Sequence, residues 1–255
     1  MSQSINLYKQ LANHKLFNKS VNFGLKRIKS ALNLLGNPER RLKNVISVVG
    51  ESGKFTTLFS LKLFIEANNQ KVTTHISPSL RDIKERFYMG KEYLSHKSIK
   101  NTIAQIEKLN IPLTIFECLT LVYVINASKV NADYNIQETG ALWRLDSNNI
   151  NDFPKLQVCT NINKQHLNFL KKKSLNEVIK EDVGSLSNFT TIYIGKQTPY
   201  VLKRIKKHLK INKSKIVYPN CWKIIKKGDL FYYQDKKNRI RPVSYTHLRA
   251  HETVR

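Results

Sequence analysis

A strand, a glycine-bounded turn and a helix follow one another in residues 44–65, and this order constrains the chain more than any other feature. Four of the five residues 45–49 are apolar and β-branched, namely Val45, Ile46, Val48 and Val49, and the run stops at Gly50. Apolar residues then recur at Leu58, Leu61 and Ile65, which is the spacing of one helix face. Such a turn points backbone N–H groups and the positive end of the helix dipole at one anion. The sequence therefore predicts a phosphate-binding loop.

The predicted nucleotide-binding loop consists of Gly50, Glu51, Ser52, Gly53, Lys54, Phe55, Thr56 and Thr57. Lys54 would reach the outer phosphates, and Thr56 or Thr57 would offer a hydroxyl to magnesium. The pattern G-x-x-x-x-G-K-[ST] is not met, because Val48 stands at the first glycine and Phe55 separates Lys54 from Thr56. An ordinary strand-to-helix turn with a chance Gly-Lys pair is the alternative.

The formal net charge of +26 over 255 residues raises the hypothesis of nucleic-acid binding. The positive charge is spread along the chain, and lysine greatly outnumbers arginine. No basic stretch is interleaved with the aromatic residues on which single strands stack. We therefore favour a coding bias over a nucleic-acid partner.

The sequence does not indicate a membrane-spanning protein or a disulfide-stabilised one either. The longest apolar segment, residues 116–130, contains Glu117, Asn126 and Lys129 and is too short to span a bilayer. The three cysteines form no C-x-x-C pair, so neither a disulfide framework nor a zinc site is expected. The sequence fits a protein of the reducing cytoplasm.

Strand-like and helix-like patterns alternate along the chain. Short β-rich runs occupy residues 71–76, 133–137, 156–160 and 190–194, and helical apolar spacing occupies residues 23–35, 99–106, 116–130 and 199–209. This alternation predicts an α/β fold of the P-loop type, with a mostly parallel sheet flanked by helices. Ligands of such sheets gather at the carboxyl ends of the strands.

Three polar side chains follow predicted strands at that edge. Ser77, Glu138 and His166 supply a hydroxyl, a carboxylate and an imidazole. Each alone fits an ordinary turn or a solvated loop. Together they are a plausible set of hard-cation ligands around a nucleotide phosphate.

Six blocks, in order, resemble the folylpolyglutamate synthase and dihydrofolate synthase branch of the Mur ligases. Residues 50–57 resemble G-T-N-G-K-G-S-T, and residues 76–80 resemble T-S-P-H-L. Residues 116–120 resemble F-E-x-L-T, and residues 138–149 resemble E-V-G-L-G-G-R-L-D-A-T-N. The stretch around His166 resembles D-H-x-x-x-L-G, and residues 175–184 resemble T-L-E-E-I-A-x-E-K-A-G. The order and spacing of the blocks are more specific than any one block.

The resemblance implies an ATP- and Mg²⁺-dependent ligase that activates a folate or dihydropteroate carboxylate as an acyl phosphate and adds glutamate to it. It implies Lys54 and His166 as catalytic residues, and a monomer in the cytoplasm. The implied metal ligands are Thr56, Ser77, Glu138, His166 and Asp182. Arg144 and Asp146 would lie beside metal and substrate. Another Mur-type ligase with a different acceptor, or a basic P-loop-like module that binds nucleic acid, is the alternative.

Several positions depart from the family pattern and indicate a divergent member. Phe55, Leu142 and Trp143 replace glycines, Ser79 replaces histidine, Gln165 replaces aspartate, and Asp182 replaces the lysine that the family carbamylates. We expect residues 1–22 to be a leader, residues 23–242 to be an incomplete ATP-binding domain with the C-terminal domain missing, and residues 243–255 to be a non-native adaptor-derived tail. The chain alone is therefore expected not to turn over.

Overall fold

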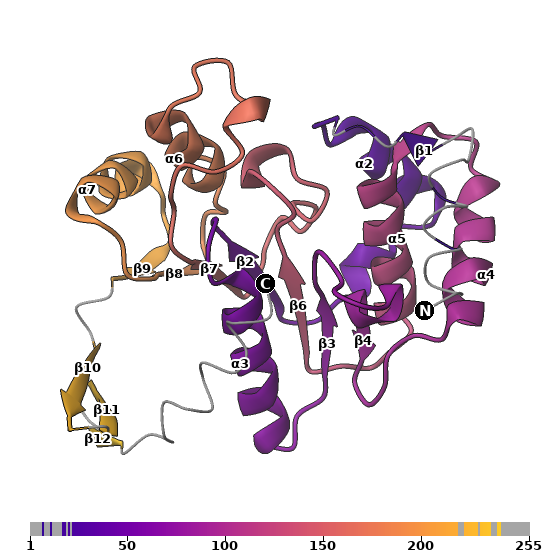
Figure 1. Ribbon diagram of the computed structural model, residues 1–255. Helices are drawn as coiled ribbons and strands as arrows, with labels where there is room; N and C mark the ends of the chain where they lie inside the picture. The colour runs from indigo at the N-terminus through magenta and orange to yellow at the C-terminus, as the bar shows by residue number, and fades with distance from the viewer. Residues whose placement is uncertain are drawn as a thin grey trace.

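Strand β2 (Val45–Val49) is the central strand of a seven-stranded sheet with the order β4-β3-β6-β2-β7-β8-β9 (Figure 1). The other strands are β3 (Val72–His75), β4 (Phe87–Met89), β6 (Tyr134–Glu138), β7 (Leu156–Cys159), β8 (Thr191–Ile194) and β9 (Lys215–Val217). Only β4 runs antiparallel to its neighbour in this sheet. The predicted mostly parallel α/β sheet is confirmed.

This computed structural model describes residues 7, 11, 17–18, 20, 22–218, 222–228, 230–235 and 239–240. Most of the predicted leader and all of the predicted tail at 243–255 lie outside the described residues, and so does Cys221. The domain boundaries expected from the sequence stay predictions.

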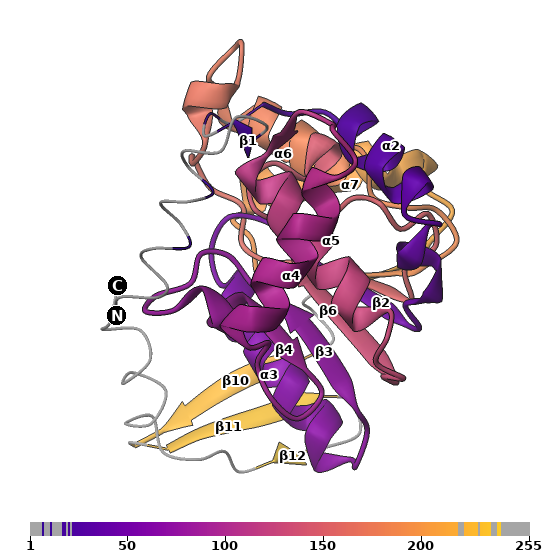
Figure 2. The same ribbon diagram turned by 90° about the vertical axis from the view of Figure 1, so that its right-hand side faces the viewer.

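Helices cover both faces of the sheet because side chains alternate along its strands. Ile46 and Val48 of β2 pack with Leu58 of α3 (Lys54–Ala67). Val45 and Val49 face the other side. That side carries α2 (Lys26–Leu34), α4 (His96–Glu107), α5 (Ile115–Ala127), α6 (Leu175–Val183) and α7 (Pro199–His208). Figures 1 and 2 show this three-layer arrangement from two sides.

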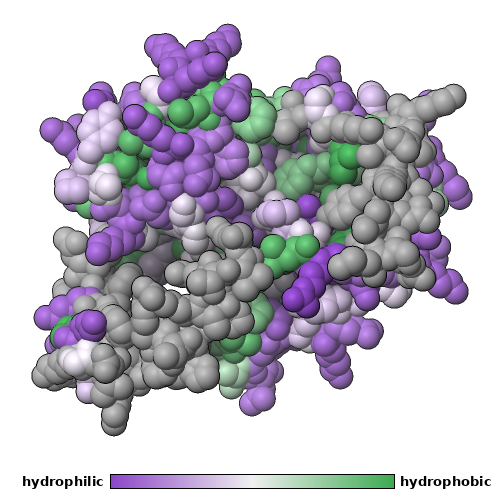
Figure 3. Space-filling view, in the orientation of Figure 1, coloured by the Kyte–Doolittle hydropathy of each residue, from purple (hydrophilic) through white to green (hydrophobic). Residues whose placement is uncertain are grey.

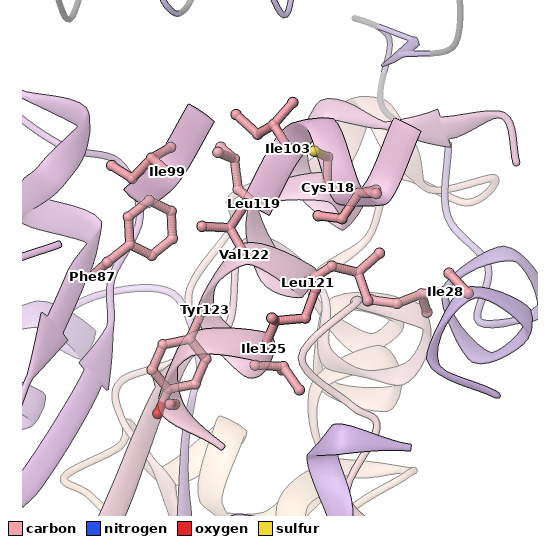
Figure 4. Close-up of a cluster of buried hydrophobic side chains, with 14 of the residues drawn as sticks. Ile28, Phe87, Ile99, Ile103, Cys118, Leu119, Leu121, Val122, Tyr123 and Ile125 are labelled. Carbon is pink, nitrogen blue, oxygen red and sulfur yellow. The ribbon is translucent and has the colours of Figure 1, made fainter. Parts of the chain in front are cut away.

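Helix α5 is buried along nearly its whole length, as its apolar sequence predicts. Leu119 and Val122 point toward α4, and Leu121 points toward Ile28 of α2 (Figure 4). Its N-terminus is fixed by a capping box, in which the side chain of Thr114 accepts a bond from the backbone N–H of Glu117 and Glu117 accepts one in return. No helix in the described part of the chain is long and apolar enough to cross a membrane.

Several further elements lie outside the sequence predictions. They are β1 (Phe17–Asn18), β5 (Leu113–Thr114), β10 (Trp222–Lys227), β11 (Leu230–Asp235), β12 (Arg239–Ile240) and the 3₁₀ turns η1 (Pro38–Arg41), η2 (Ile83–Arg86), η3 (Trp143–Leu145), η4 (Leu167–Phe169) and η5 (Leu209–Ile211). Strands β10, β11 and β12 form a separate antiparallel sheet. β4 and β9 were not predicted either, because three residues are too few to show a period.

Hydrophilic residues cover much of the described surface in the view of Figure 3, and hydrophobic residues lie between them. The polar face of α7 ends in Lys206, Lys207 and His208, whereas its Val201 and Ile205 are buried. The helix predicted from the apolar spacing at residues 199–209 is therefore confirmed. Its cations suit the negative end of the helix dipole.

Candidate nucleotide site

The loop between β2 and α3 has the predicted strand, glycine turn and helix order. Gly50 has φ 116°, and a Cβ atom there would lie 2.6 Å from Oγ1 and 3.2 Å from the backbone N of Thr160. Gly53 has φ 84° and caps α3 in the left-handed conformation. At both positions the positive φ angle favours glycine over any residue with a side chain.

Phe55 stands where the resembling family has a loop glycine, and the structure shows how it is accommodated. It lies in the first turn of α3, outside the left-handed region. Its ring stacks on that of Phe59, with the centroids 5.8 Å apart. The replacement therefore causes no positive-φ strain.

Lys54 is buried under the loop. Its Nζ donates to the carbonyl oxygens of Gly50 at 2.8 Å and Glu51 at 3.2 Å. Burial raises the pKa of both Asp146 and Asp182, and the positive charge of Lys54 opposes this rise. The ammonium group is thus held at the sheet edge where the sequence predicts phosphate.

The loop is tied to the residues that follow β7. The backbone N–H groups of Glu51 and Ser52 both donate to the carbonyl oxygen of Asn161, at 3.0 Å each. The amide of Asn163 donates to Oγ of Ser52 at 2.8 Å. Two of the backbone donors predicted to face an anion are therefore engaged within the protein.

Glu51 makes a side-chain hydrogen bond that the sequence did not indicate. Its carboxylate Oε2 lies 2.6 Å from Nδ1 of His166, although the two residues are 115 positions apart. The Glu51 side chain is fully buried, and its other oxygen has no hydrogen-bond partner. An acidic residue inside a predicted phosphate loop was the available signal, since it needs a positive or donating partner there.

Asp182 joins the same group of charges, and we call Glu51, Lys54, His166 and Asp182 the loop cluster. Its Oδ1 accepts a bond from the backbone N–H of Trp143, and Oδ2 is buried without a partner. Burial, followed by the negative charge of Glu51, raises the pKa of Asp182 to about 7. Asp182 is therefore a buried residue of α6.

Ser77 and Glu138 meet at the ends of neighbouring strands β3 and β6. The backbone N–H of Ser77 donates to Oε2 of the buried Glu138 at 3.1 Å. The Ser77–Pro78 peptide bond is cis. Asn148 donates its amide to the carbonyl oxygen of Glu138 at 2.8 Å and so ties this strand end to the following loop.

Asp146 organises the loop after β6. Its two oxygens accept bonds from the backbone N–H groups of Gly140, Ala141 and Asn148. Burial raises its pKa to about 6, although these bonds and the charge of Lys54 oppose the shift. The carboxyl group is thus built into the loop close enough to Lys54 to feel its charge.

The neighbouring positions 142–144 differ from one another in environment. Leu142 has φ 52°, a conformation that costs a side chain but not a glycine, and Trp143 is almost fully buried. Arg144 instead pairs with Glu181 of α6, with 2.8 Å between Nε and Oε2. Its side chain remains 46% exposed, so it is the most accessible of the predicted substrate residues beside this loop.

The structure thus brings the predicted site residues into two groups at one sheet edge. Ser77 and Glu138 form one, and His166 and Asp182 belong to the loop cluster with Lys54. Thr56 lies on an exposed part of α3. Within the described ranges, no group of three or more His, Cys, Asp or Glu residues is arranged to hold a metal ion. The predicted metal set therefore stays a prediction. Of its members, Asp182 has an unpartnered buried oxygen, a hard donor of the kind that Mg²⁺ prefers.

A cavity of about 520 Å³ lies elsewhere, at the amino end of the sheet. It is lined by Val45, the first residue of β2, by Glu39 of η1, and by Ile150 to Phe153 before β7. This is the edge opposite the loop. The cavity is therefore separate from the candidate nucleotide site.

Comparison with known proteins gives consistent results. No model of a protein family matches the chain. A dihydrofolate synthase/folylpolyglutamate synthase of Buchnera aphidicola subsp. Schizaphis graminum is 33% identical over 204 residues, which are 78% of this chain and 47% of that protein. A dihydrofolate synthetase of Saccharomyces cerevisiae is 25% identical over 199 residues, covering 75% and 46%. The chain spans about half the length of these relatives.

Solved structures agree in fold. The bifunctional folylpolyglutamate synthase/dihydrofolate synthase of Yersinia pestis, complexed with AMPPNP and a Mn ion, has a TM-score of 0.79 at 22% identity and covers 94% of this chain and 57% of its own. E. coli FolC in complex with DHPP and ADP has a TM-score of 0.81 at 24% identity, and the match covers 98% of this chain and 62% of that chain. At these identities the likeness establishes the fold alone.

Proposed function

Because this chain is a homologue of the dihydrofolate synthase/folylpolyglutamate synthase family, we propose that it supplies the ATP-binding part of a ligase that joins glutamate to a folate or dihydropteroate carboxylate. The observation that carries the proposal is the buried Lys54 ammonium, which lies under a glycine loop between a central parallel strand and a helix. This is the place in an α/β sheet where phosphates bind.

The proposed reaction has two steps. An oxygen of the acceptor carboxylate attacks the terminal phosphorus of ATP, the bond to the bridging oxygen breaks, and ADP leaves. The amine of glutamate then attacks the acyl carbon, phosphate leaves, and the nitrogen loses a proton to form the amide. Both steps bring anions together, so fixed positive charge at the phosphates lowers the barrier.

Lys54 is the residue of the chain that we assign to this neutralisation. Its ammonium group is already held by two loop carbonyl oxygens, so little reorganisation is needed when phosphate arrives. Gly50 and Gly53 permit the backbone of the loop to approach the ligand closely. Glu51, Ser52, Phe55, Thr56 and Thr57 complete the proposed nucleotide-binding loop.

A divalent cation such as Mg²⁺, when bound, would neutralise charge on the phosphate oxygens. The residues that we propose to hold it are Thr56, Ser77, Glu138, His166 and Asp182. Oxygen donors dominate this set, as a hard cation requires. Arg144 and Asp146 are proposed to face the acceptor.

Equilibrium binding to the 255-residue chain tests the proposal. We expect a fluorescent ATP analogue to bind with Mg²⁺ present and to be displaced by unlabelled ATP. A random single-stranded oligonucleotide of matched charge is the control for the strong basicity of the chain. Tighter oligonucleotide binding with a steep salt dependence, and no displacement by ATP, would support a nucleic-acid module instead.

A further inference from the structure

We infer that Glu51 is a positioning residue, which fixes the ring of His166 so that Nε2 carries the lone pair offered to the divalent cation. The inference deepens the proposed function and rests on it. The carboxylate of Glu51 and Nδ1 of His166 are 2.6 Å apart, and this bond joins the nucleotide loop to the segment after β7.

The burial of Glu51 shows that this contact is specific. Its side chain is fully buried, whereas the His166 side chain is 27% exposed. A buried carboxylate in a phosphate loop repels the ligand and loses hydration, so it persists only with a strong partner. The His166 ring is the partner that the structure provides.

The chemistry of the two groups assigns the proton. An ionised carboxylate only accepts hydrogen bonds, so Nδ1 of His166 must carry the hydrogen. In the neutral ring, Nε2 is then the nitrogen with the free lone pair. Metal-binding histidines are commonly held in this way, with the second ring nitrogen donating to a carboxylate.

Two further features restrict the His166 ring. The backbone of His166 is left-handed, with φ 55°, and it opens the 3₁₀ turn η4. The ring of Phe169 lies nearly parallel to the imidazole at a centroid distance of 6.1 Å. The ring is therefore held by a carboxylate at one edge and faced by an aromatic side chain, while part of it stays accessible.

The ring tautomer tests the inference without any metal or nucleotide. Long-range ¹H–¹⁵N NMR of the histidine rings, assigned with His166→Ala, should show Nδ1 protonated in the wild-type chain. In Glu51→Leu the hydrogen should move to Nε2 or become mixed, and Glu51→Gln should show an intermediate effect because its amide oxygen still accepts. The exposed Glu92→Leu is the matched control. An Nε2–H ring in the wild type, or an unchanged ring in Glu51→Leu, overturns the inference.

Mn²⁺ binding, followed by electron paramagnetic resonance with ATP present, tests the consequence. Glu51→Leu should weaken Mn²⁺ binding about 10- to 100-fold, the usual loss when the partner of a histidine ligand is removed. In a His166→Ala background the same substitution should cause no further loss. Equal losses in both backgrounds would show that Glu51 acts on its own and would overturn the positioning role.

The two measurements separate this inference from the proposed function. If ATP fails to bind the wild-type chain while the tautomer depends on Glu51, the proposed function fails and the positioning of the ring stands. If ATP and Mn²⁺ bind and neither Glu51 substitution affects the ring or the metal, the inference fails and the proposed function stands.

Discussion

Oδ1 of Asp182 accepts a hydrogen bond from the backbone N–H of Trp143 at 3.2 Å, while Oδ2 of the same carboxyl group is buried without a partner. This contact joins α6 to the loop after β6. It also leaves one buried oxygen beside Glu51, whose charge contributes to the raised pKa of Asp182. The half-satisfied carboxyl group has consequences for both stability and metal binding.

The first prediction concerns stability. The pKa of Asp182 is raised from 3.8 to about 7, so the folded state holds a proton that the unfolded state has lost between these values. The stabilisation from this group is present below about pH 4 and is lost as the pH rises to about 7. Asp182→Asn keeps the Oδ1 acceptor and removes the charge. At pH 8 we expect it to be more stable than the wild type, because it buries a neutral amide in place of an ionised carboxylate.

Urea unfolding at pH 4 and pH 8 measures this difference. The variant and the wild type should be alike at pH 4 and should separate at pH 8. Glu181→Gln is the control, since Glu181 lies beside Asp182 on α6 and pairs with Arg144 of η3. A variant that is destabilised equally at both pH values would show that the charge of Asp182 is compensated.

The second prediction concerns the same substitution and the cation. If Asp182 contributes to the cation site, Asp182→Asn should raise the Mg²⁺ concentration needed for ATP-analogue binding far more than it weakens metal-free binding. A magnesium ion requires oxygen ligands at about 2.0 to 2.1 Å and keeps several waters, so we expect Asp182 to act through a water. An unchanged Mg²⁺ titration would remove Asp182 from the proposed metal set.

The third prediction concerns Gly50. Gly50→Ala places a methyl group 2.6 Å from Oγ1 of Thr160 in a backbone with φ 116°. We expect the free energy of unfolding to fall by about 1–3 kcal/mol, because backbone strain and a close contact act together. Gly36→Ala is the matched control, since Gly36 also has positive φ but no atom within 4 Å of the added methyl. Thermal unfolding compares the stabilities of the two variants. Equal destabilisation in Gly50→Ala and Gly36→Ala would show that the contact with Thr160 adds no destabilisation.

The sequence predicts the elements that are long enough to show a regular pattern of apolar residues. Strands β2, β3, β6, β7 and β8 and helix α5 follow from apolar runs and turns, and their ends lie within three residues of the expected positions. The antiparallel β4 has three residues and shows no period.

The site is predictable in its position but not in its contacts. The sequence places Lys54 and His166 at the carboxyl edge of the sheet, and both residues lie there in the structure. The pairing of Glu51 with His166 was not predicted, because it spans 115 residues and depends on how β2 and β7 lie side by side. The burial of Asp182 likewise depends on Trp143, 39 residues earlier in the chain. Neither contact leaves a local pattern.

Lys54 is proposed to bind the phosphates of ATP, and a pair of lysine substitutions on α3 tests this role. Lys54→Met removes the buried ammonium, and Lys62→Met removes a cation on the same helix that pairs with Glu66. Isothermal titration with Mg²⁺-ATP is the measurement, after circular dichroism has confirmed that both variants are folded. We predict that Lys54→Met weakens ATP binding about 30- to 150-fold, since a charge-assisted contact to phosphate is worth about 2–3 kcal/mol, whereas Lys62→Met binds as the wild type does. Equal ATP affinity in the wild type and in a folded Lys54→Met chain would show that Lys54 does not bind the phosphates.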